Sequence, residues 1–444
     1  MNGGTAMASR SEIYLERFSR MIRKETISVK GQTDLTKFRE FHGLLKELFP
    51  ALFAVCEVED FDGSLLIKWE GRDFSKQPLL FMNHHDVVEA PGEWKYGAFD
   101  GICAEGKLWG RGTLDTKGGL YSMLQAADEL CAEGFVPEQT IYFESSCNEE
   151  TDGTGAQAIA AELARRGVTF RYILDEGGMI MYDPIGGADG VFAMVGMGEK
   201  GCADLKFTAK SSGGHASTPG KNTPLVRLGK FMAACEKEKL FDVEISSVIE
   251  EMFRRFAPYM KGMMKTVFSH PKGFAPVIKK VMPGVSPTAE ALLQTTITFT
   301  MSRGSDGTNV LPQGAWLIGN MRFSHHQGRE DSIAKVKALA EKFDIETEVL
   351  EPGFSSRLSD PMAPEFEIIG EAVEAVFKDV KAVPYIMTGG SDCRFFTDLS
   401  ENCYRFVPFT ITKEQMASIH GLNENVDVSC LEPAVDFYKY LMRK

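Results

Sequence analysis

The sequence predicts an α/β fold: a mostly parallel sheet with helices on both faces, interrupted by an inserted α+β domain. Three observations predict it. Up to about residue 180, apolar strand-like segments alternate with amphipathic helical segments, which is typical of a parallel sheet covered on both sides. From about residue 200, apolar and polar residues alternate singly, which indicates a sheet with one solvated face. The length of 444 residues exceeds what one compact core usually holds.

The first part of the chain supplies most of the predicted parallel sheet. Residues 11–24 predict a helix because their apolar residues recur on one face, and a second helix is expected over about 33–48. The strongest helix prediction is 117–135, where an apolar stripe ends at Gly134. The other elements predicted here are strands at 64–69, 78–83, 140–146 and 170–178, and a helix at 154–167.

The inserted part begins near residue 200. Its alternating strands are predicted at 202–211, 295–301 and 315–324, with helices at 223–240 and 329–343. A Met- and Phe-rich stretch, 245–285, is predicted to be helical. Buried-type elements return after about 350, as a helix at 364–378 and a strand at 404–410. We therefore predict one discontinuous domain, residues 1–199 and 351–444, and an inserted domain, residues 200–350.

Composition narrows the partners and the compartment. A formal net charge of −13 argues against nucleic acid or an anionic membrane surface as the main partner. No apolar run approaches the ~20 residues of a membrane span, and the N-terminus has no basic segment followed by an apolar one. Nine scattered cysteines without a C-x-x-C pair fit free thiols in a reducing cytoplasm. Any metal site must then use histidine and carboxylate ligands.

Two adjacent histidines, His84 and His85, follow the predicted strand 78–83 and precede Asp86. On an extended chain His84 and Asp86 share a face and His85 takes the other. A metal-bound histidine usually donates its second N–H to a carboxylate, which His84 and Asp86 can arrange. A pair of histidines that simply satisfy their hydrogen bonds at a strand end is the alternative.

Further acidic residues follow strands or precede helices of the same predicted sheet. Asp115 lies in a glycine-rich loop before the helix 117–135, where a role as helix N-cap is the alternative. Glu149 and Glu150 follow a buried strand, where a ligand crevice opens in such sheets. One of the pair can bind metal while the other accepts a proton from a metal-bound water, although a surface acidic loop is the simpler explanation. Asp175 and Glu176 follow the next strand.

The order of these residues favours a metal site. The order along the chain is a histidine, an aspartate, a glutamate pair, a further acidic pair and the histidine His420. Each acidic member follows a strand or precedes a helix of the same predicted sheet. Nitrogen and oxygen ligands without thiolate suit zinc, with cobalt or manganese as substitutes. One shared carboxylate would hold two ions ~3.5–4 Å apart, as in two-metal hydrolases.

These motifs resemble a known family, the co-catalytic zinc metallopeptidases that include aminoacylase, acetylornithine deacetylase, succinyl-diaminopimelate desuccinylase and glutamate carboxypeptidase. The motifs occur in the family's order from about residue 84 to 425, over nearly the whole chain: NHHDVV, GRGTLDTKGG, NEETDGTGA, LDEGG, GGHAS, TNVLP, TGGSDCRFF and IHGLNENV. The Met- and Phe-rich stretch is most similar to the carboxypeptidase S and N-acyl-amino-acid hydrolase branch.

The resemblance implies a role for each matching residue. His84 is a metal ligand and Asp86 its carboxylate partner; Asp115 bridges the ions, and Glu149 is the general base. In the LDEGG motif the glutamate, Glu176, is the implied ligand rather than Asp175. One ion would be bound by His84, Asp115 and Glu176, and the other by Asp115, Glu150 and His420.

The inserted domain resembles the family's lid and dimerisation domain, which implies a homodimer. His215 would reach the partner subunit's site and steady the oxyanion; an exposed loop histidine is the alternative. The residues implied to hold the substrate's carbonyl or carboxylate are Asn309, Arg322, Gly389, Gly390, Ser391 and Arg394. A guanidinium fork and bare backbone N–H groups suit a carboxylate.

The sequence departs from the family pattern at several positions. Asn83 replaces a glycine, His85 occupies a position that is often small or tyrosine, and Thr116 replaces a methionine. None of these changes removes an implied ligand.

The resemblance as a whole implies a two-zinc amidohydrolase that cleaves an amide or peptide bond beside a free carboxylate. Its substrates would be N-acyl amino acids or short peptides. A non-catalytic amino-acid or peptide binder on the same fold is the alternative. The stretch 245–285 could line an apolar acyl pocket, but packing in the core or in a dimer is the preferred explanation.

Overall fold

A computed structural model describes residues 9–284, 287–350, 353–354 and 356–444. Residue 285, the end of the predicted helical stretch, and residue 351, the start of the second segment of the predicted discontinuous domain, lie outside the described residues. Among the described residues, no helix is both long and apolar enough to cross a membrane.

The main sheet has eight strands in the order β1-β2-β6-β3-β7-β16-β8-β15. Four neighbouring pairs in that order are parallel, including the central β6–β3, β3–β7 and β7–β16. The strands are β1 (Glu57–Phe61), β2 (Ser64–Trp69), β3 (Leu79–Met82), β6 (Ile141–Ser145), β7 (Tyr172–Tyr182), β8 (Val191–Glu199), β15 (Val380–Met387) and β16 (Cys403–Ile411). The predicted fold class, a mostly parallel sheet with an additional α+β region, is confirmed.

Helices cover both faces of the main sheet. The larger core lies on one face, and α4 and α14 pack against each other there. A smaller core on the other face contains buried residues of α5. The helices of this part are α1 (Arg10–Arg23), α2 (Thr36–Leu48), α3 (Pro50–Val55), α4 (Lys117–Ala132), α5 (Thr154–Arg165), α12 (Pro364–Val376), α13 (Lys413–Ser418) and α14 (Leu431–Met442).

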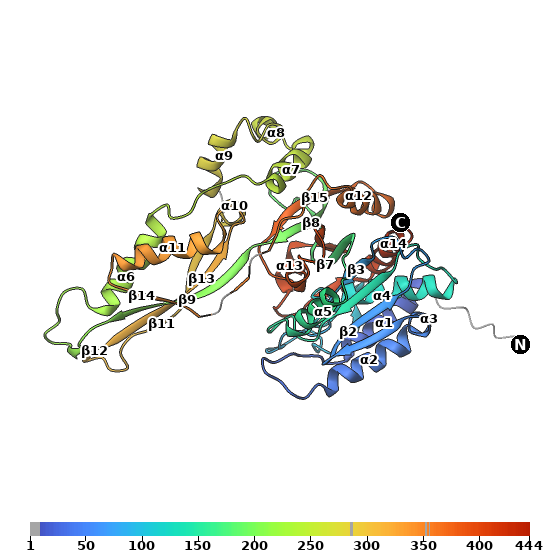
Figure 1. Cartoon of the computed structure of the whole chain (residues 1–444), viewed down its shortest axis with the longest axis horizontal. Helices are drawn as coiled ribbons and strands as arrows, with labels where there is room; N and C mark the ends of the chain where they lie inside the picture. Colours follow the sequence, from blue (N-terminus) through green and yellow to red (C-terminus); the bar gives the residue numbers. More distant parts are fainter. Residues whose placement is uncertain (1–8, 285–286, 351–352, 355) are drawn as a thin grey trace, which may run out of the picture.

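A second, antiparallel sheet lies beside the first, at the left of Figure 1. Its order is β11-β13-β9-β14, formed by Thr296–Arg303, Gly314–Phe323, Gly201–Lys210 and Glu346–Val349. Along β9 buried and half-buried side chains alternate, as the period-two pattern predicted. The helices α6 (Pro224–Lys237) and α11 (Gly328–Glu341) pack on its buried face. A small ribbon, β10 (Gly214–His215) with β12 (Val310–Leu311), lies at the end far from the main sheet.

The Met- and Phe-rich stretch is helical, as predicted, and it packs on the main sheet. Phe192 of β8 makes edge-to-face contacts with Phe256 and Tyr259, at centroid distances of 4.8 and 4.9 Å. The elements are α7 (Ser247–Phe256), η1 (Ala257–Tyr259), α8 (Gly262–Ser269), α9 (Ala275–Val281), η2 (Met282–Gly284) and α10 (Pro287–Leu293). The main core therefore extends into the range predicted for the inserted domain. These contacts favour the packing role for the stretch over the acyl pocket.

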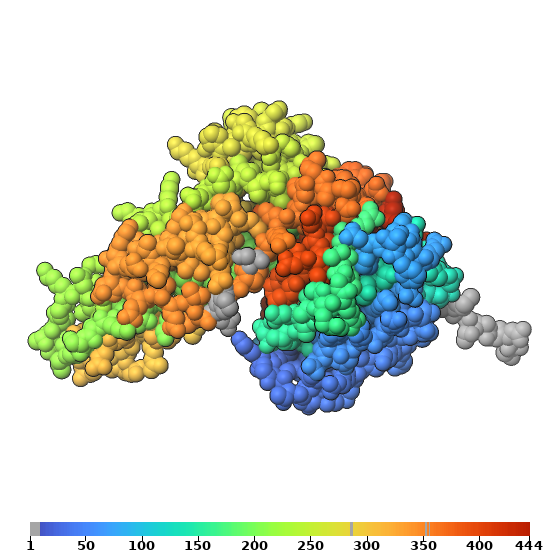
Figure 2. All heavy atoms as spheres, viewed as in Figure 1, coloured from blue at the N-terminus to red at the C-terminus, as the bar shows by residue number. Residues whose placement is uncertain are grey.

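The remaining elements are short, and three of them form a small separate sheet in the order β17-β5-β4. They are β4 (Ile102–Ala104), β5 (Lys107–Trp109), β17 (Asn425–Asp427), η3 (Asp392–Phe395) and η4 (Val428–Cys430). The pairing of β17 with β5 brings residues 425–427 beside 107–109. Figure 2 shows that the molecule is hollowed between the second-sheet region and the N-terminal part of the main body.

Candidate metal centre

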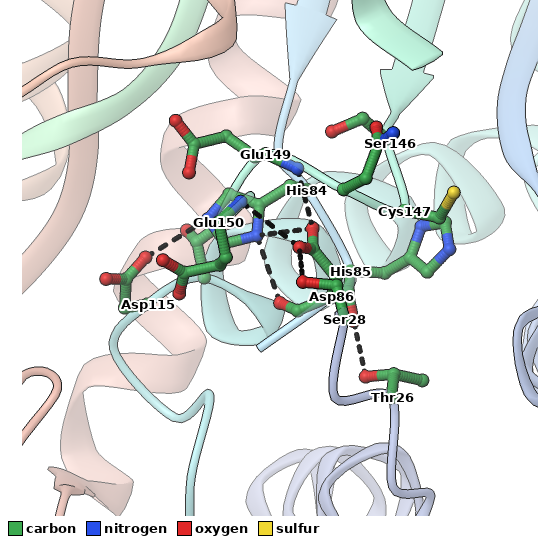
Figure 3. A network of polar contacts seen from close by, with 12 residues as sticks. Thr26, Ser28, His84, His85, Asp86, Asp115, Ser146, Cys147, Glu149 and Glu150 are labelled. Carbon is green, nitrogen blue, oxygen red and sulfur yellow. Dashed lines mark hydrogen bonds and ion pairs between the residues drawn. The ribbon is translucent and has the colours of Figure 1, made fainter. Parts of the chain in front are cut away.

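Three of the predicted ligands come together: His84 and Glu150 follow the carboxyl ends of β3 and β6, and Asp115 lies in the loop before α4. One ligand atom of each lies within 4.8 Å of the others. The Nε2 atom of His84 is 3.1 Å from Oδ1 of Asp115. On the other side, Nε2 of His420 is 3.0 Å from Oδ2 of Asp115 and 3.1 Å from Oε2 of Glu150. Asp115 therefore lies between two imidazoles, one on each of its oxygens (Figure 3 shows His84 and Glu150 beside it).

The strand geometry fixes the orientation of His84. The backbone continues the parallel ladder past β3, with the N–H of His85 donated to Ser146 at 2.9 Å. The Nδ1 atom of His84 is 3.0 Å from the carbonyl oxygen of Asp86 and 3.3 Å from its Oδ1. Nδ1 is thus held by Asp86, and Nε2 faces Asp115, as a metal-ligating imidazole requires.

Asp86 also positions the glutamate pair. Its Oδ1 accepts the backbone N–H of Glu149 and its Oδ2 that of Glu150, both at 3.1 Å. Ser28 donates its hydroxyl to the same Oδ2 at 2.6 Å. The carboxylate of Asp86 is fully buried and holds the turn after β6 in place.

Glu176 and Asp175 differ in how far their carboxylate oxygens are already occupied by hydrogen bonds. Both oxygens of Asp175 already accept backbone N–H groups, from Glu176 and Cys393, each at 2.8 Å. The pairing of β7 with β16 shifts register between Asp175 and Gly178, which places a bulge at Glu176. Burial raises the pKa of both carboxyl groups, so the difference between them lies in their hydrogen bonds: those of Asp175 are taken by the backbone. These observations favour Glu176 over Asp175 as the carboxylate that serves the cluster.

Burial and nearby carboxylates favour the protonated form of the glutamate pair, Glu149 and Glu150. Burial raises the pKa of Glu149 well above normal, and neighbouring carboxylates add to the effect. Burial and Asp115 likewise raise the pKa of Glu150, whose Oε1 is buried with no hydrogen-bond partner among the described residues. Hydrogen bonds to Asp115 and Glu150 raise the pKa of His420 to about 10. Divalent cations would replace these protons, so the donor set fits a metal site.

Glu149 projects beside the cluster and contacts Arg394. The Nη1 atom of Arg394 is 3.4 Å from Oε1 of Glu149 and donates to the Ser391 carbonyl at 2.8 Å. Its guanidinium also lies over the rings of Phe354 and Phe395, at 5.1 and 4.6 Å. The guanidinium is thus fixed against the carboxylate predicted to be the general base.

The loop before Arg394 is only partly open. A side chain at Gly389 would meet open space, whereas one at Gly390 would meet the Arg394 side chain. Ser391 is fully buried, and its backbone N–H is donated to the buried Glu199. That N–H is therefore already engaged, a contact that was not predicted from the sequence.

His215, Asn309 and Arg322, the predicted residues of the second-sheet region, form hydrogen bonds with neighbours in that same region. His215 is exposed on the β10–β12 ribbon, where its Nδ1 is 2.7 Å from the Ser217 hydroxyl. Asn309 is exposed beside it and accepts the Ala216 N–H at 2.9 Å. Arg322 is half-buried on β13 and donates to Asn320 at 3.1 Å. Their roles at a catalytic site stay predictions.

Two of the departures from the family pattern contact each other. The hydroxyl of Thr116 donates to Oδ1 of Asn83 at 3.0 Å, and both residues are buried. The two unusual residues therefore form a hydrogen bond between the end of β3 and the Asp115 loop.

His85 lies on the opposite side of its strand from the metal ligands, as Figure 3 shows. Its ring stacks on Phe41 at 5.4 Å and meets Phe38 and His42 edge-on at 5.6 and 5.2 Å. Its Nδ1 is 2.9 Å from the Ser145 hydroxyl. Burial lowers the pKa of His85 well below normal, so the ring is a neutral core side chain.

Replacing His85 with alanine is expected to leave metal content unchanged and to lower stability by about 2–4 kcal/mol, as for other large-to-small core substitutions. Metal analysis and urea unfolding of the variant would measure both effects. Loss of metal at full stability would contradict this assignment of faces.

Sequence profiles define the class of protein: residues 80–444 match the peptidase family M20/M25/M40. The chain belongs to this family of hydrolases. It is 30% identical to the N-fatty-acyl-amino acid synthase/hydrolase of Homo sapiens, over 91% of this chain and 82% of that protein. It is 29% identical to the probable carboxypeptidase S-like 2 of Dictyostelium discoideum, over 92% and 79%. The family and the branch expected from the motifs are therefore confirmed.

Solved structures agree with the fold. An M20 family metallo-carboxypeptidase from Sulfolobus solfataricus superimposes with a TM-score of 0.73 at 17% identity, over 97% of this chain and 98% of that one. Human carnosine dipeptidase 1 gives a TM-score of 0.60 at 13% identity, over 97% and 96%.

Proposed function

We propose that the protein is a zinc-dependent amidohydrolase that cleaves an amide or peptide bond beside a free carboxylate. Its substrates would be N-acyl amino acids or short peptides. The observation that carries the proposal is the contact between Arg394 and Glu149 at the edge of the ligand cluster. A guanidinium that binds the substrate's carboxylate there would bring the neighbouring amide bond against the general base.

The family pattern implies two ligand sets, and the cluster of His84, Asp115 and Glu150 supports a metal site at this place. His84, Asp115 and Glu176 would hold one zinc ion, and Asp115, Glu150 and His420 the other, with cobalt or manganese as substitutes. When bound, the ions would supply Lewis-acid polarisation and lower the pKa of a water molecule.

The protein's own residues would carry the proton. Glu149, with its backbone fixed by Asp86, would take a proton from the attacking water and return it to the leaving nitrogen. Arg394 would hold the carboxylate of the substrate, together with the loop of Gly389, Gly390 and Ser391.

The second-sheet region would complete the site in a homodimer. We propose that His215 of the partner subunit stabilises the oxyanion and that Asn309 and Arg322 contact the substrate. The exposure of His215 at the end of the ribbon supports a role outside its own subunit.

A matched substrate panel tests the proposal. It contains N-acyl amino acids, dipeptides and the same compounds with the carboxyl group amidated, each assayed with and without chelator. We expect hydrolysis of the free acids only, lost on chelation and restored by zinc, cobalt or manganese. Equal cleavage of the amidated compounds would contradict the carboxylate role, and indifference to chelation would contradict the metal role. Binding without turnover across the whole panel would favour the non-catalytic binder.

A further inference from the structure

Glu424 is a fully buried carboxylate four residues after His420, in the loop before β17. Its Oε1 accepts the backbone N–H groups of Leu114 and Asp115 at 2.8 and 3.1 Å. Its Oε2 accepts the N–H of Gly112 at 3.1 Å and Nη1 of Arg111 at 2.8 Å. One side chain thus binds three backbone groups of the Asp115 loop, including that of Asp115 itself.

Arg111 ties the same loop back to His420. It is buried, and its Nη2 donates to the carbonyl of Gly421, the residue after His420, at 2.9 Å. Its guanidinium lies over the ring of Trp94 at 5.2 Å. The N–H of Gly110 donates to the carbonyl of Glu424 at 2.9 Å. The pair Arg111–Glu424 therefore connects residues 110–115 with residues 421–424 in both directions.

The two loops joined in this way carry two proposed ligands of one ion. The side chains of Asp115 and His420 meet at 3.0 Å, and each also contacts one further member of the cluster, His84 for Asp115 and Glu150 for His420. The backbone of His420 has a positive φ of 58°, and its side chain is about half exposed. The separation of the two ligand atoms therefore depends on how the loops are held relative to each other.

A buried ion pair is a poor source of net stability, because desolvation offsets most of the attraction. The hydrogen bonds that Glu424 accepts instead hold the Arg111–Glu424 pair in a single arrangement, because both carboxylate oxygens of Glu424 are occupied. Such outer partners commonly set the affinity of a metal site.

We propose that Glu424 is a positioning residue which, with Arg111, sets the spacing of Asp115 and His420 for a divalent cation. The inference rests on the proposed metal-dependent function. Glu424 touches neither a ligand side chain nor the substrate in this scheme, so it acts through the Asp115 backbone.

The test uses Glu424→Gln, which keeps the size of the side chain but turns an amide N–H₂ toward backbone or guanidinium donors. The metal-free enzyme is titrated with zinc against a competing chelator, and the visible spectrum of the cobalt form is recorded. We expect about 10–100-fold weaker zinc affinity and an altered cobalt spectrum. Activity at limiting zinc falls with the affinity and recovers largely at excess zinc.

The matched control is Asp128→Asn. Asp128 is also a buried carboxylate that accepts two backbone N–H groups, of Ala51 and Leu52, and an arginine, Arg17. It lies on α4, away from the metal ligands. Its substitution is expected to lower stability without changing zinc affinity.

The outcomes separate the two levels of the proposal. A Glu424→Gln protein that loses stability as the control does, with wild-type zinc affinity and cobalt spectrum, overturns the positioning role alone. A wild-type protein that binds no divalent cation overturns this role and the proposed function together. If Glu424→Gln does not fold, Arg111→Met replaces it in the test. This variant removes the hydrogen bond to Gly421 but keeps the aliphatic stem, and the same loss of zinc affinity is expected. An unchanged zinc affinity in Arg111→Met also overturns the positioning role.

Discussion

Replacing Glu149 with glutamine is expected to reduce kcat by about 10²–10⁴-fold while metal content stays at the wild-type level. Glutamine keeps the length of the side chain and leaves the backbone N–H that Asp86 accepts at 3.1 Å. It cannot accept and return a proton. Steady-state kinetics on the best substrate of the panel, together with metal analysis of the purified variant, measure the two effects.

The neighbouring Glu150 provides the matched comparison. Its backbone is held by the same aspartate, but its Oε2 lies 3.1 Å from the ring of His420. Glu150→Gln is therefore expected to lose metal as well as activity. If the two variants lose metal equally, or if Glu149→Gln keeps near wild-type kcat, the division of roles within the pair is wrong.

The part of the site that the sequence could predict depends on local geometry. Alternation along a strand places His84 and Asp86 on one face and His85 on the other, and the structure agrees. The carboxyl ends of neighbouring parallel strands meet at one edge, so acidic residues after successive strands were expected to come together. Those two rules bring His84 and Glu150 together, and Asp115 reaches them from the loop before α4.

What could not be predicted depends on contacts between distant segments. Glu424 binds backbone N–H groups of residues 112–115, and a backbone donor leaves no mark in the sequence. An acidic residue in the polar loop IHGLNENV has many possible roles, so its presence alone was no signal. Glu199 is comparable: it binds the Ser391 N–H and the buried Arg405, far along the chain.

Some strands of the main sheet were not predicted, for a similar reason. No strand was predicted over Val191–Glu199 or Val380–Met387, which pair with each other at one edge of the main sheet. Both are short apolar segments, and such runs do not distinguish strand from helix by periodicity. Their place became evident only from pairing with β16 and from the packing of α7 on β15.

Asp115→Asn is expected to remove more metal than substitution of any other proposed ligand. The two oxygens of Asp115 face different imidazoles, His84 at 3.1 Å and His420 at 3.0 Å, so one carboxylate would serve both ions. An asparagine presents only one oxygen, and its amide N–H₂ repels a cation on the other side. Both sites should then weaken by more than the roughly 10–100-fold typical of losing an outer partner, and activity should fall with them.

Stoichiometry distinguishes a shared ligand from an ordinary one. His84→Ala and His420→Ala each remove a ligand of a single ion, so each should retain part of the wild-type metal at a zinc concentration that saturates the wild type. Asp115→Asn should retain almost none at that concentration, and His85→Ala should retain all of it. Because the variants differ by one side chain within one cluster, elemental analysis after identical dialysis compares them directly. If Asp115→Asn holds as much zinc as His84→Ala, the carboxylate does not join two sites, and a single-ion centre built on His84, Asp115 and Glu150 becomes the better description.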